Sequence, residues 1–299
     1  MEEQLVAFLS HLEQQYRYSE NTVAAYRNDL YQFLAYVKSR WGTELENWSS
    51  ISENDIEAYL QYMKDKDHPY ASSTIARKVA AIKSFYNYLS TQGMVDKNPT
   101  LEIDSPKVKK RLPRTLNPDE VDRLLRAPGD DRSPKTLRDR SLLNVLYETG
   151  MRVTEVVSIQ LNDLSPDRKT LSSPTRQGEG REIPLEESTQ ALLASYLAEG
   201  RPMLAKNDRE QALFLNHRGE KLTRQGLWLI IKGYARQAGL KTQVTPHTLR
   251  HSFAVHRLGQ GSSLEDVQAL LGHANLSTTQ IYAQMESVDG EKSSSTQSN

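Results

Sequence analysis

Residues 245–285 read TPHTLRHSFAVHRLGQGSSLEDVQALLGHANLSTTQIYAQM, and this stretch decides the fold. At its start, Thr245 is suited to cap a helix and Pro246 to occupy the first turn, so a helix should begin here. His247 and Arg250 then lie one turn apart on the same helix face, where both side chains can converge on one anion. The helix N-terminus adds partial positive charge and unpaired amides. This segment predicts a helix whose N-terminus suits an anion, although a His three residues before an Arg usually forms only a surface pair.

The second half of the stretch predicts two helices joined by a turn. The segment 270–272 should end the first helix, His273 lies in the turn, and Ser277 with Gln280 should cap the next helix. That helix carries Tyr282. A tyrosine in such a position is normally a half-buried core residue with its hydroxyl hydrogen-bonded. On its own Tyr282 therefore indicates packing, and only the residues around it suggest chemistry.

A further turn presents an arginine. A helix is expected over 136–149, and Gly150 suits its left-handed C-cap. Arg152 then stands at the start of the next helix. An arginine on such a turn is most often a salt-bridge partner, here of Glu155 or Glu148.

The rest of the chain predicts a mainly α protein. Asn117 begins a capping box with Pro at the first helical position, which marks the start of a second domain. Helical periodicity lapses at 164–185, where two short extended runs predict an antiparallel hairpin. Helices are expected again over 186–198, 223–238, 246–258, 264–271 and 277–286. The predicted domains are a helical core-binding domain at 1–104, a basic linker at 105–116, a catalytic domain at 117–286 and a polar, disordered tail at 287–299.

The first hundred residues predict about four helices. Ser19 suits the cap of the second, and 74–90 carries one apolar stripe with basic residues off it. A solvated polar face explains any single lysine there, and a solvated tether explains the basic linker equally well. If the two domains clamp a duplex, however, the basic residues of 74–90 and those of the linker would both contact phosphates. The candidate DNA contacts are Arg77, Lys78, Lys83, Lys107, Lys109, Lys110 and Arg111.

Charge is distributed unevenly although its sum is zero. Residues 1–106 hold 10 Lys/Arg and 15 Asp/Glu, whereas 107–299 hold 28 and 23. Residues 221–264 carry seven basic and no acidic side chains, which suggests an anion-binding groove. The chain has no cysteine, so disulfides and thiolate metal sites are excluded and a reducing cytoplasm is favoured. No apolar run is long enough to span a membrane.

Taken in order, Arg152, His247-x-x-Arg250, His273 and Tyr282 strongly resemble the catalytic residues of the tyrosine recombinase (phage integrase) family, and within it the bacterial Xer type. The matching motifs are TGMR, HTLRHSFAVH, LLGH and TTQIY, all within 148–285. The N-terminal half is similar to the family's core-binding domain more loosely, through a Ser-x-x-Thr-x-x-x-Tyr run at 19–26 and the basic linker.

The resemblance implies a role for each residue. Arg152 and Arg250 would grip the scissile phosphate and stabilise its pentacoordinate transition state. His247 would assist proton transfer at the nucleophile, and His273 would donate to a non-bridging oxygen. Tyr282 would attack and form a 3′-phosphotyrosine bond. That bond keeps the energy needed for rejoining, so no ATP, metal or other cofactor is expected.

One family position does not match. The hairpin usually carries a lysine that donates a proton to the 5′-oxygen, and alignment places Arg176 there. Arginine is a poor proton donor because its pKa lies above about 12. Arg176 could still fill the role less well, Lys169 could reach in from the preceding strand, or cleavage could be impaired.

The implied partner is double-stranded DNA with an inverted-repeat site, bound by a homo- or hetero-tetramer on synapsed DNA. A second recombinase or a DNA translocase could take part, and the role could be chromosome dimer resolution or recombination of a mobile element. Two alternatives stay open: a DNA-binding protein of this fold with weak or lost cleavage, and a topoisomerase-like enzyme that relaxes DNA through the same bond.

Overall fold

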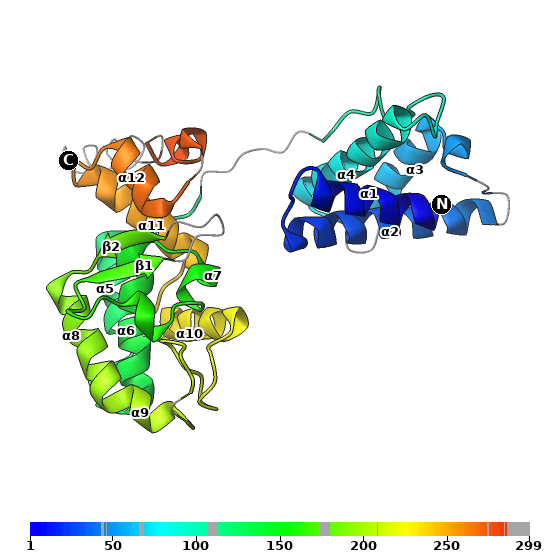
Figure 1. Ribbon diagram of the computed structural model, residues 1–299. Helices are drawn as coiled ribbons and strands as arrows, with labels where there is room; N and C mark the ends of the chain where they lie inside the picture. Colours follow the sequence, from blue (N-terminus) through cyan, green and yellow to red (C-terminus); the bar gives the residue numbers. More distant parts are fainter. Residues whose placement is uncertain are drawn as a thin grey trace, which may run out of the picture. The chain divides into compact units, whose positions relative to one another are not determined.

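The computed structural model confirms a mainly helical chain with one small antiparallel sheet (Figure 1). The chain divides into two compact units, Met1–Lys110 and Arg111–Asn299. This division falls inside the linker expected at 105–116. The structure describes residues 1–42, 45, 47–65, 69–106, 113–173, 180–207, 209–273, 275–283 and 285. The expected tail and the linker residues Lys107, Lys109, Lys110 and Arg111 lie outside these ranges.

The first unit is a bundle of helices around an aromatic core. Ser19 caps its second helix by accepting a hydrogen bond from the Thr22 amide, as the sequence predicts. The core contains Phe8, Phe33 and Phe85, each at most 1 % exposed. The described elements are α1 (Glu2–Gln14), α2 (Glu20–Trp41), η2 (Trp48–Ser50), α3 (Glu53–Lys64) and α4 (Ser72–Thr91).

Lys78 does not lie on a polar surface, which corrects its assignment as a DNA contact. Its side chain is 2 % exposed, and its Nζ donates to Asp29 Oδ1 and to Gln32 Oε1, both at 2.8 Å. Asp29 is itself 1 % exposed and also pairs with Arg77. A buried carboxylate needs such partners, so Lys78 neutralises a charge between α2 and α4. Helical spacing cannot reveal this, because the partner is 49 residues away.

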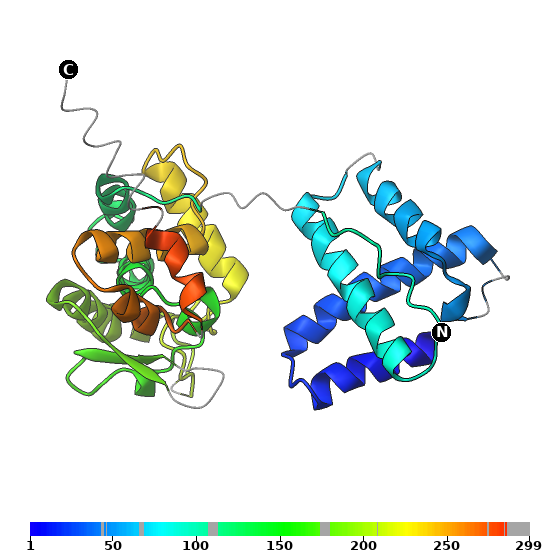
Figure 2. The ribbon, with the colours of Figure 1, turned by 90° about the horizontal axis from the view of Figure 1, so that it is seen from above.

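The second unit is built around α6, which contacts most of the other helices (Figures 1 and 2). The capping box at Asn117 and the left-handed Gly150 that ends α6 are both as predicted. The described elements before the sheet are α5 (Pro118–Arg126), α6 (Pro134–Thr149), α7 (Val153–Val156) and η3 (Leu161–Asp163). Those after it are α8 (Glu187–Ser195), the π-helical η4 (Tyr196–Gly200), α9 (Arg201–Leu204), α10 (Arg224–Gln237), α11 (Pro246–Gly259), α12 (Leu264–Leu271) and η5 (Leu276–Thr278).

The sheet is the predicted hairpin. Strand β1 (Thr170–Ser173) pairs antiparallel with β2 (Arg181–Pro184), with Leu171 opposite Ile183. Both of these side chains are buried in the main core. The hairpin's connection at 174–179, which includes Arg176, lies outside the described residues.

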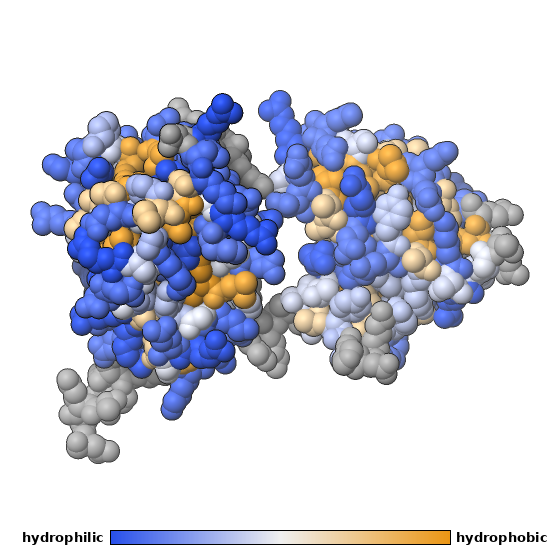
Figure 3. Space-filling model, turned by 90° about the horizontal axis from the view of Figure 1, so that it is seen from below, coloured by the Kyte–Doolittle hydropathy of each residue, from blue (hydrophilic) through white to orange (hydrophobic). Residues whose placement is uncertain are grey.

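The second unit has two apolar cores. The larger one surrounds α6, and a smaller one joins α11, α12 and the helical residues 280–283. Tyr282 belongs to the smaller core together with Phe253 and Leu271. On the face drawn in Figure 3, hydrophilic residues cover most of each unit and apolar areas are small. No described helix is long and apolar enough to cross a membrane.

Candidate active site

A glycine turn at the end of α6 shapes one side of the site. Gly150 has φ +57°, and a Cβ there would lie 2.5 Å from a ring carbon of Phe253. The position therefore requires glycine for its backbone conformation and for the close approach of α11. Thr149 fixes the preceding residues, because its hydroxyl donates to the Val145 carbonyl at 2.6 Å and accepts from the Met151 amide at 3.3 Å. The turn is thus a rigid platform.

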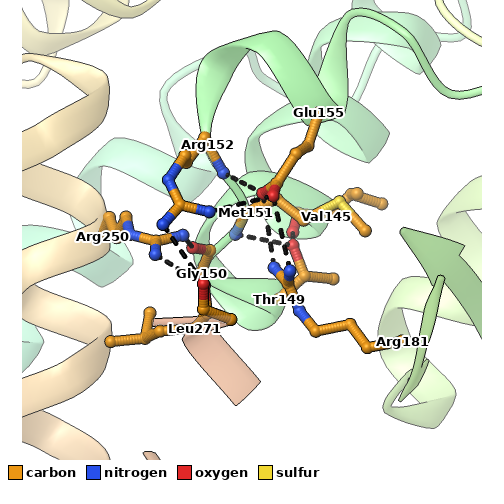
Figure 4. A network of polar contacts seen from close by, with 10 residues as sticks. Val145, Thr149, Gly150, Met151, Arg152, Glu155, Arg181, Arg250 and Leu271 are labelled. Carbon is orange, nitrogen blue, oxygen red and sulfur yellow. Dashed lines mark hydrogen bonds and ion pairs between the residues drawn. The ribbon is translucent and has the colours of Figure 1, made fainter. Parts of the chain in front are cut away.

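Arg250 joins this turn to two other helices (Figure 4). From α11 its Nη1 donates to the Gly150 carbonyl, and its Nη2 donates to the Leu271 carbonyl at the end of α12 at 2.7 Å. The side chain is buried, 4 % exposed. Burial, followed by the positive charge of Arg152, lowers the pKa of Arg250 to about 10, so it stays charged at neutral pH.

Arg152 shares a carboxylate with an arginine that the sequence reasoning did not select (Figure 4). Its Nη1 donates to Glu155 Oε1 at 3.1 Å, and its amide donates to Glu155 Oε2 at 2.6 Å. Arg181, from β2, donates to the same carboxylate at 3.3 and 3.4 Å. Burial alone would raise the pKa of Glu155, but the hydrogen bonds from Arg152 and Arg181 bring it below its usual value. Among the residues that the structure describes, the site therefore holds three arginines against one carboxylate.

A second glycine turn brings α12 against this cluster. Gly272 has φ +63°, and its carbonyl accepts from Arg152 Nη2 at 3.3 Å. A Cβ at Gly272 would lie 2.5 Å from Arg181 Nη1, so glycine leaves space for that guanidinium. The sequence motif that ends in this glycine and His273 thus positions the arginines as well as the histidine.

Tyr282 lies beside the arginines with its ring in the smaller core. The side chain is 2 % exposed, and its hydroxyl shares a hydrogen bond of 2.9 Å with His251 Nδ1. Burial raises the pKa of Tyr282, whereas the positive charges of Arg250 and Arg152 act in the opposite direction. The phenol is therefore protonated at neutral pH, and the cations next to it would favour the phenolate as it forms.

Among the described residues, the rings of His251 and His273 lie against the phenol ring. The His273 ring stacks on the Tyr282 ring, with 6.4 Å between the ring centroids and an angle of 18° between the planes. His273 Nδ1 shares a hydrogen bond of 2.9 Å with Thr279 Oγ1. The His247 ring stacks on His251 at 6.3 Å. Burial lowers the pKa of His251 to about 4, and His247 and Arg250 act in the same direction. Burial likewise lowers the pKa of His273 to about 4, helped by the positive charges of Arg250 and Arg152. His251 and His273 are therefore neutral at neutral pH.

The chain matches a family model described as phage integrase family over residues 114–287, and one described as the phage integrase N-terminal SAM-like domain over 5–93. The chain belongs to the phage integrase family. The tyrosine recombinase XerC of Herpetosiphon aurantiacus is 46% identical over 282 residues, covering 94% of this chain and 90% of the relative. The tyrosine recombinase XerD of Listeria innocua is 40% identical over 265 residues, covering 88% of each chain.

Solved structures share the fold of this recombinase. XerH bound to a palindromic difH substrate in a post-cleavage complex matches with a TM-score of 0.75 and 23% identity, covering 92% of this chain and 79% of that one. A lambda integrase dimer bound to a COC′ core site matches with a TM-score of 0.71 and 17% identity, covering 94% of each chain.

The recombinase fold brings together four of the residues singled out in the sequence: Arg152, Arg250, His273 and Tyr282. His247 is exposed on the same helix as Arg250 and contacts His251. Lys169 is exposed just before β1, and Arg176 lies outside the described residues. Of the two suggested partners of Arg152, Glu155 holds it, whereas Glu148 accepts from the Glu186 amide.

Sequence reasoning missed His251, Arg181 and Thr279. His251 follows Arg250 directly and lies one turn after His247, so the same spacing argument could have placed it near the site. Arg181 and Thr279 gave no comparable signal, because their partners come from distant segments. Asn275, rather than Ser277, caps the turn after His273 by accepting from the Ser277 amide at 3.0 Å. Within the described ranges, no group of three or more His, Asp or Glu side chains is arranged to hold a metal ion.

Proposed function

We propose that this protein cleaves and rejoins DNA at an inverted-repeat site through a 3′-phosphotyrosine bond at Tyr282, as an Xer-type recombinase. Site-specific tyrosine recombination is the broader activity, and it follows from the family and from the XerC and XerD relatives. The observation that supports these assignments is the clustering of Arg152 and Arg250 around the Gly150 turn (Figure 4), from which their positive charges act on the Tyr282 phenol.

The arginines would bind the scissile phosphate. Arg250 uses two N–H groups on the carbonyls of Gly150 and Leu271, which leaves further donors of its planar guanidinium for an anion. The side chain of Arg152 is 43% exposed and can meet a phosphate from solvent. Because Arg152 directly follows the Gly150 turn and Arg250 is hydrogen-bonded to it, both charges are held in place and would stabilise the developing negative charge without rearrangement.

The histidines would divide the remaining work. The His273 ring is held by Thr279 Oγ1 and is proposed to donate from its other nitrogen to a non-bridging phosphate oxygen. His247 was expected to assist proton transfer at the nucleophile, but the contact with the phenol is made by His251. His247 is exposed and is proposed to contact the phosphate instead. Protonation of the 5′-oxygen is proposed for Arg176, with Lys169 as the alternative.

The proposed partner is duplex DNA. Solved structures of the same fold include XerH on a difH substrate and a lambda integrase tetramer on a Holliday junction. We propose a tetramer on two synapsed sites, formed by this chain alone or together with a second recombinase. A DNA translocase is the proposed activator. In the first unit, the proposed phosphate contacts are Arg77, which is exposed, and Lys83, which is half-buried. The proposed compartment is the cytoplasm.

Covalent trapping tests this function. The protein would select inverted-repeat duplexes from a random-sequence pool. A selected site would then be nicked near the cleavage position, so that cleavage releases a short fragment bearing the 5′-hydroxyl, which diffuses away. We expect a protein–DNA adduct that is resistant to denaturation and absent in Tyr282→Phe, which should still bind the site. Tight, sequence-specific binding without any adduct would favour the DNA-binding alternative, and relaxation of supercoiled DNA without sequence preference would favour the topoisomerase-like one.

A further inference from the structure

The Tyr282 hydroxyl has a specific imidazole partner. Among the described residues, His251 and His273 lie against the ring, and the hydrogen bond to the oxygen is made by His251 Nδ1, at 2.9 Å. His273 Nδ1 instead bonds Thr279 Oγ1, and His247 stacks behind His251. A proton acceptor must lie within hydrogen-bond reach of the proton that it takes, and His251 meets this requirement.

We propose that His251 accepts the proton of Tyr282 during strand cleavage. The inference rests on the proposed function, and it assigns to His251 the role that the family resemblance implied for His247. As the phenol oxygen attacks, its O–H bond breaks and the proton passes to His251 Nδ1. The new O–P bond forms while the P–O5′ bond breaks, and the departing 5′-oxygen takes a proton from the leaving-group acid or from water. In rejoining, the 5′-hydroxyl attacks phosphorus and gives its proton back to the leaving-group acid's conjugate base or to water. The tyrosine O–P bond breaks, and the His251 imidazolium returns its proton to the phenolate.

The charges around His251 would make its imidazole a stronger proton acceptor once DNA is bound. The groups that face it are His247 and Arg250 on α11, His273 at the end of α12 and Tyr282 itself. Burial, followed by His247 and the charge of Arg250, lowers the pKa of His251 to about 4, so it is neutral and able to accept in the free protein. A phosphate bound to Arg250 would offset that positive charge and make the imidazole more basic. Proton uptake would thus be favoured when substrate is present.

A purely structural role for His251 makes different predictions. His251 could simply hold a buried hydroxyl, because an unpaired buried hydroxyl destabilises a core. In that case any neutral acceptor of similar size would do. Asparagine is such an acceptor: its Oδ1 can receive the hydrogen bond, but it takes no proton at neutral pH.

The decisive experiment compares His251→Asn with the wild-type protein in single-turnover covalent trapping on the selected, nicked duplex. General base catalysis contributes about 100-fold or more, so we expect the cleavage rate to fall by about that factor while DNA binding is retained. Replacing Tyr282 with 3,5-difluorotyrosine in the His251→Asn protein should restore most of the rate, because a more acidic phenol needs less help to lose its proton. His256→Asn is the matched control on the same helix, and its cleavage should stay near the wild-type rate.

Two results would overturn the proposal: a wild-type rate in His251→Asn, or a slow rate that the fluorinated phenol does not improve. If His251→Asn does not fold, nitrogen NMR of ¹⁵N-histidine-labelled wild-type protein tests the hydrogen bond on which the proposal depends. We expect His251 to carry its proton on Nε2 with Nδ1 as acceptor, whereas a proton on Nδ1 would refute the assignment. Failure of the wild-type protein to form any adduct would instead refute the proposed function.

Discussion

Gly150→Ala should destabilise the second unit and disable the site. The alanine Cβ would lie 2.5 and 2.8 Å from two ring carbons of Phe253 and 3.0 Å from a methyl carbon of Leu271. A left-handed conformation costs a non-glycine residue about 1–2 kcal/mol, and overpacking a core costs about 1–3 kcal/mol, so the sum is about 2–5 kcal/mol. The platform that holds Arg250 would shift with the turn, so we also expect slower adduct formation.

A matched glycine separates the two contributions. Gly239 also has a positive φ, +66°, but a Cβ there would have nothing within 4 Å. Gly239→Ala should therefore lose only the backbone part, about 1–2 kcal/mol. Urea unfolding monitored by circular dichroism measures both variants, and trapping on the nicked duplex measures cleavage. If Gly150→Ala is no less stable than Gly239→Ala, the steric argument for this turn is wrong.

Arg250→Lys should slow adduct formation by about 100-fold, because an ammonium cannot bond two carbonyls and a phosphate in one plane, and near wild-type trapping would contradict this. In the folded state the pKa of His251 and of His273 is about 4, against a usual value of 6.5. Between these values the unfolded chain binds more protons than the folded one, so the stability present above pH 6.5 is lost as the pH falls toward 4. The thermal unfolding midpoint should fall across this range, and less so in His251→Asn; an equal fall would refute the account. Lys78→Met should destabilise the first unit by about 3 kcal/mol in urea unfolding, because it leaves Asp29 without its buried partner, whereas Lys83→Ala should have little effect; equal effects would refute a structural role for Lys78.

The sequence predicted elements whose signals are local. Asn117, Ser19 and Gly150 mark helix ends by side-chain capping or by backbone conformation, and the structure has all three as expected. The hairpin also followed from a local change of periodicity. Such features depend on neighbours within a few residues, which a single sequence contains.

What the sequence could not give depends on distant partners. Lys78 lies at a position compatible with either a surface or a core, and only Asp29, from another helix, decides between them. Arg181 joins the site because β2 passes beside the turn that holds Arg152 and Glu155. His251 differs, because its spacing was visible, but only the fold shows that its ring meets a hydroxyl 31 residues further along the chain.

The acceptors of Arg250 are main-chain oxygens, at Gly150 and Leu271, and every amino acid carries such an oxygen. A change of side chain at position 271 alters packing in the smaller core but leaves the hydrogen bond available. Glu155 offers no such freedom, because its carboxylate is itself the acceptor for Arg152 and Arg181. The two arginines therefore differ in mutational robustness: the contact of Arg250 at position 271 should tolerate a change of side chain, whereas the contact of Arg152 with Glu155 depends on that one carboxylate.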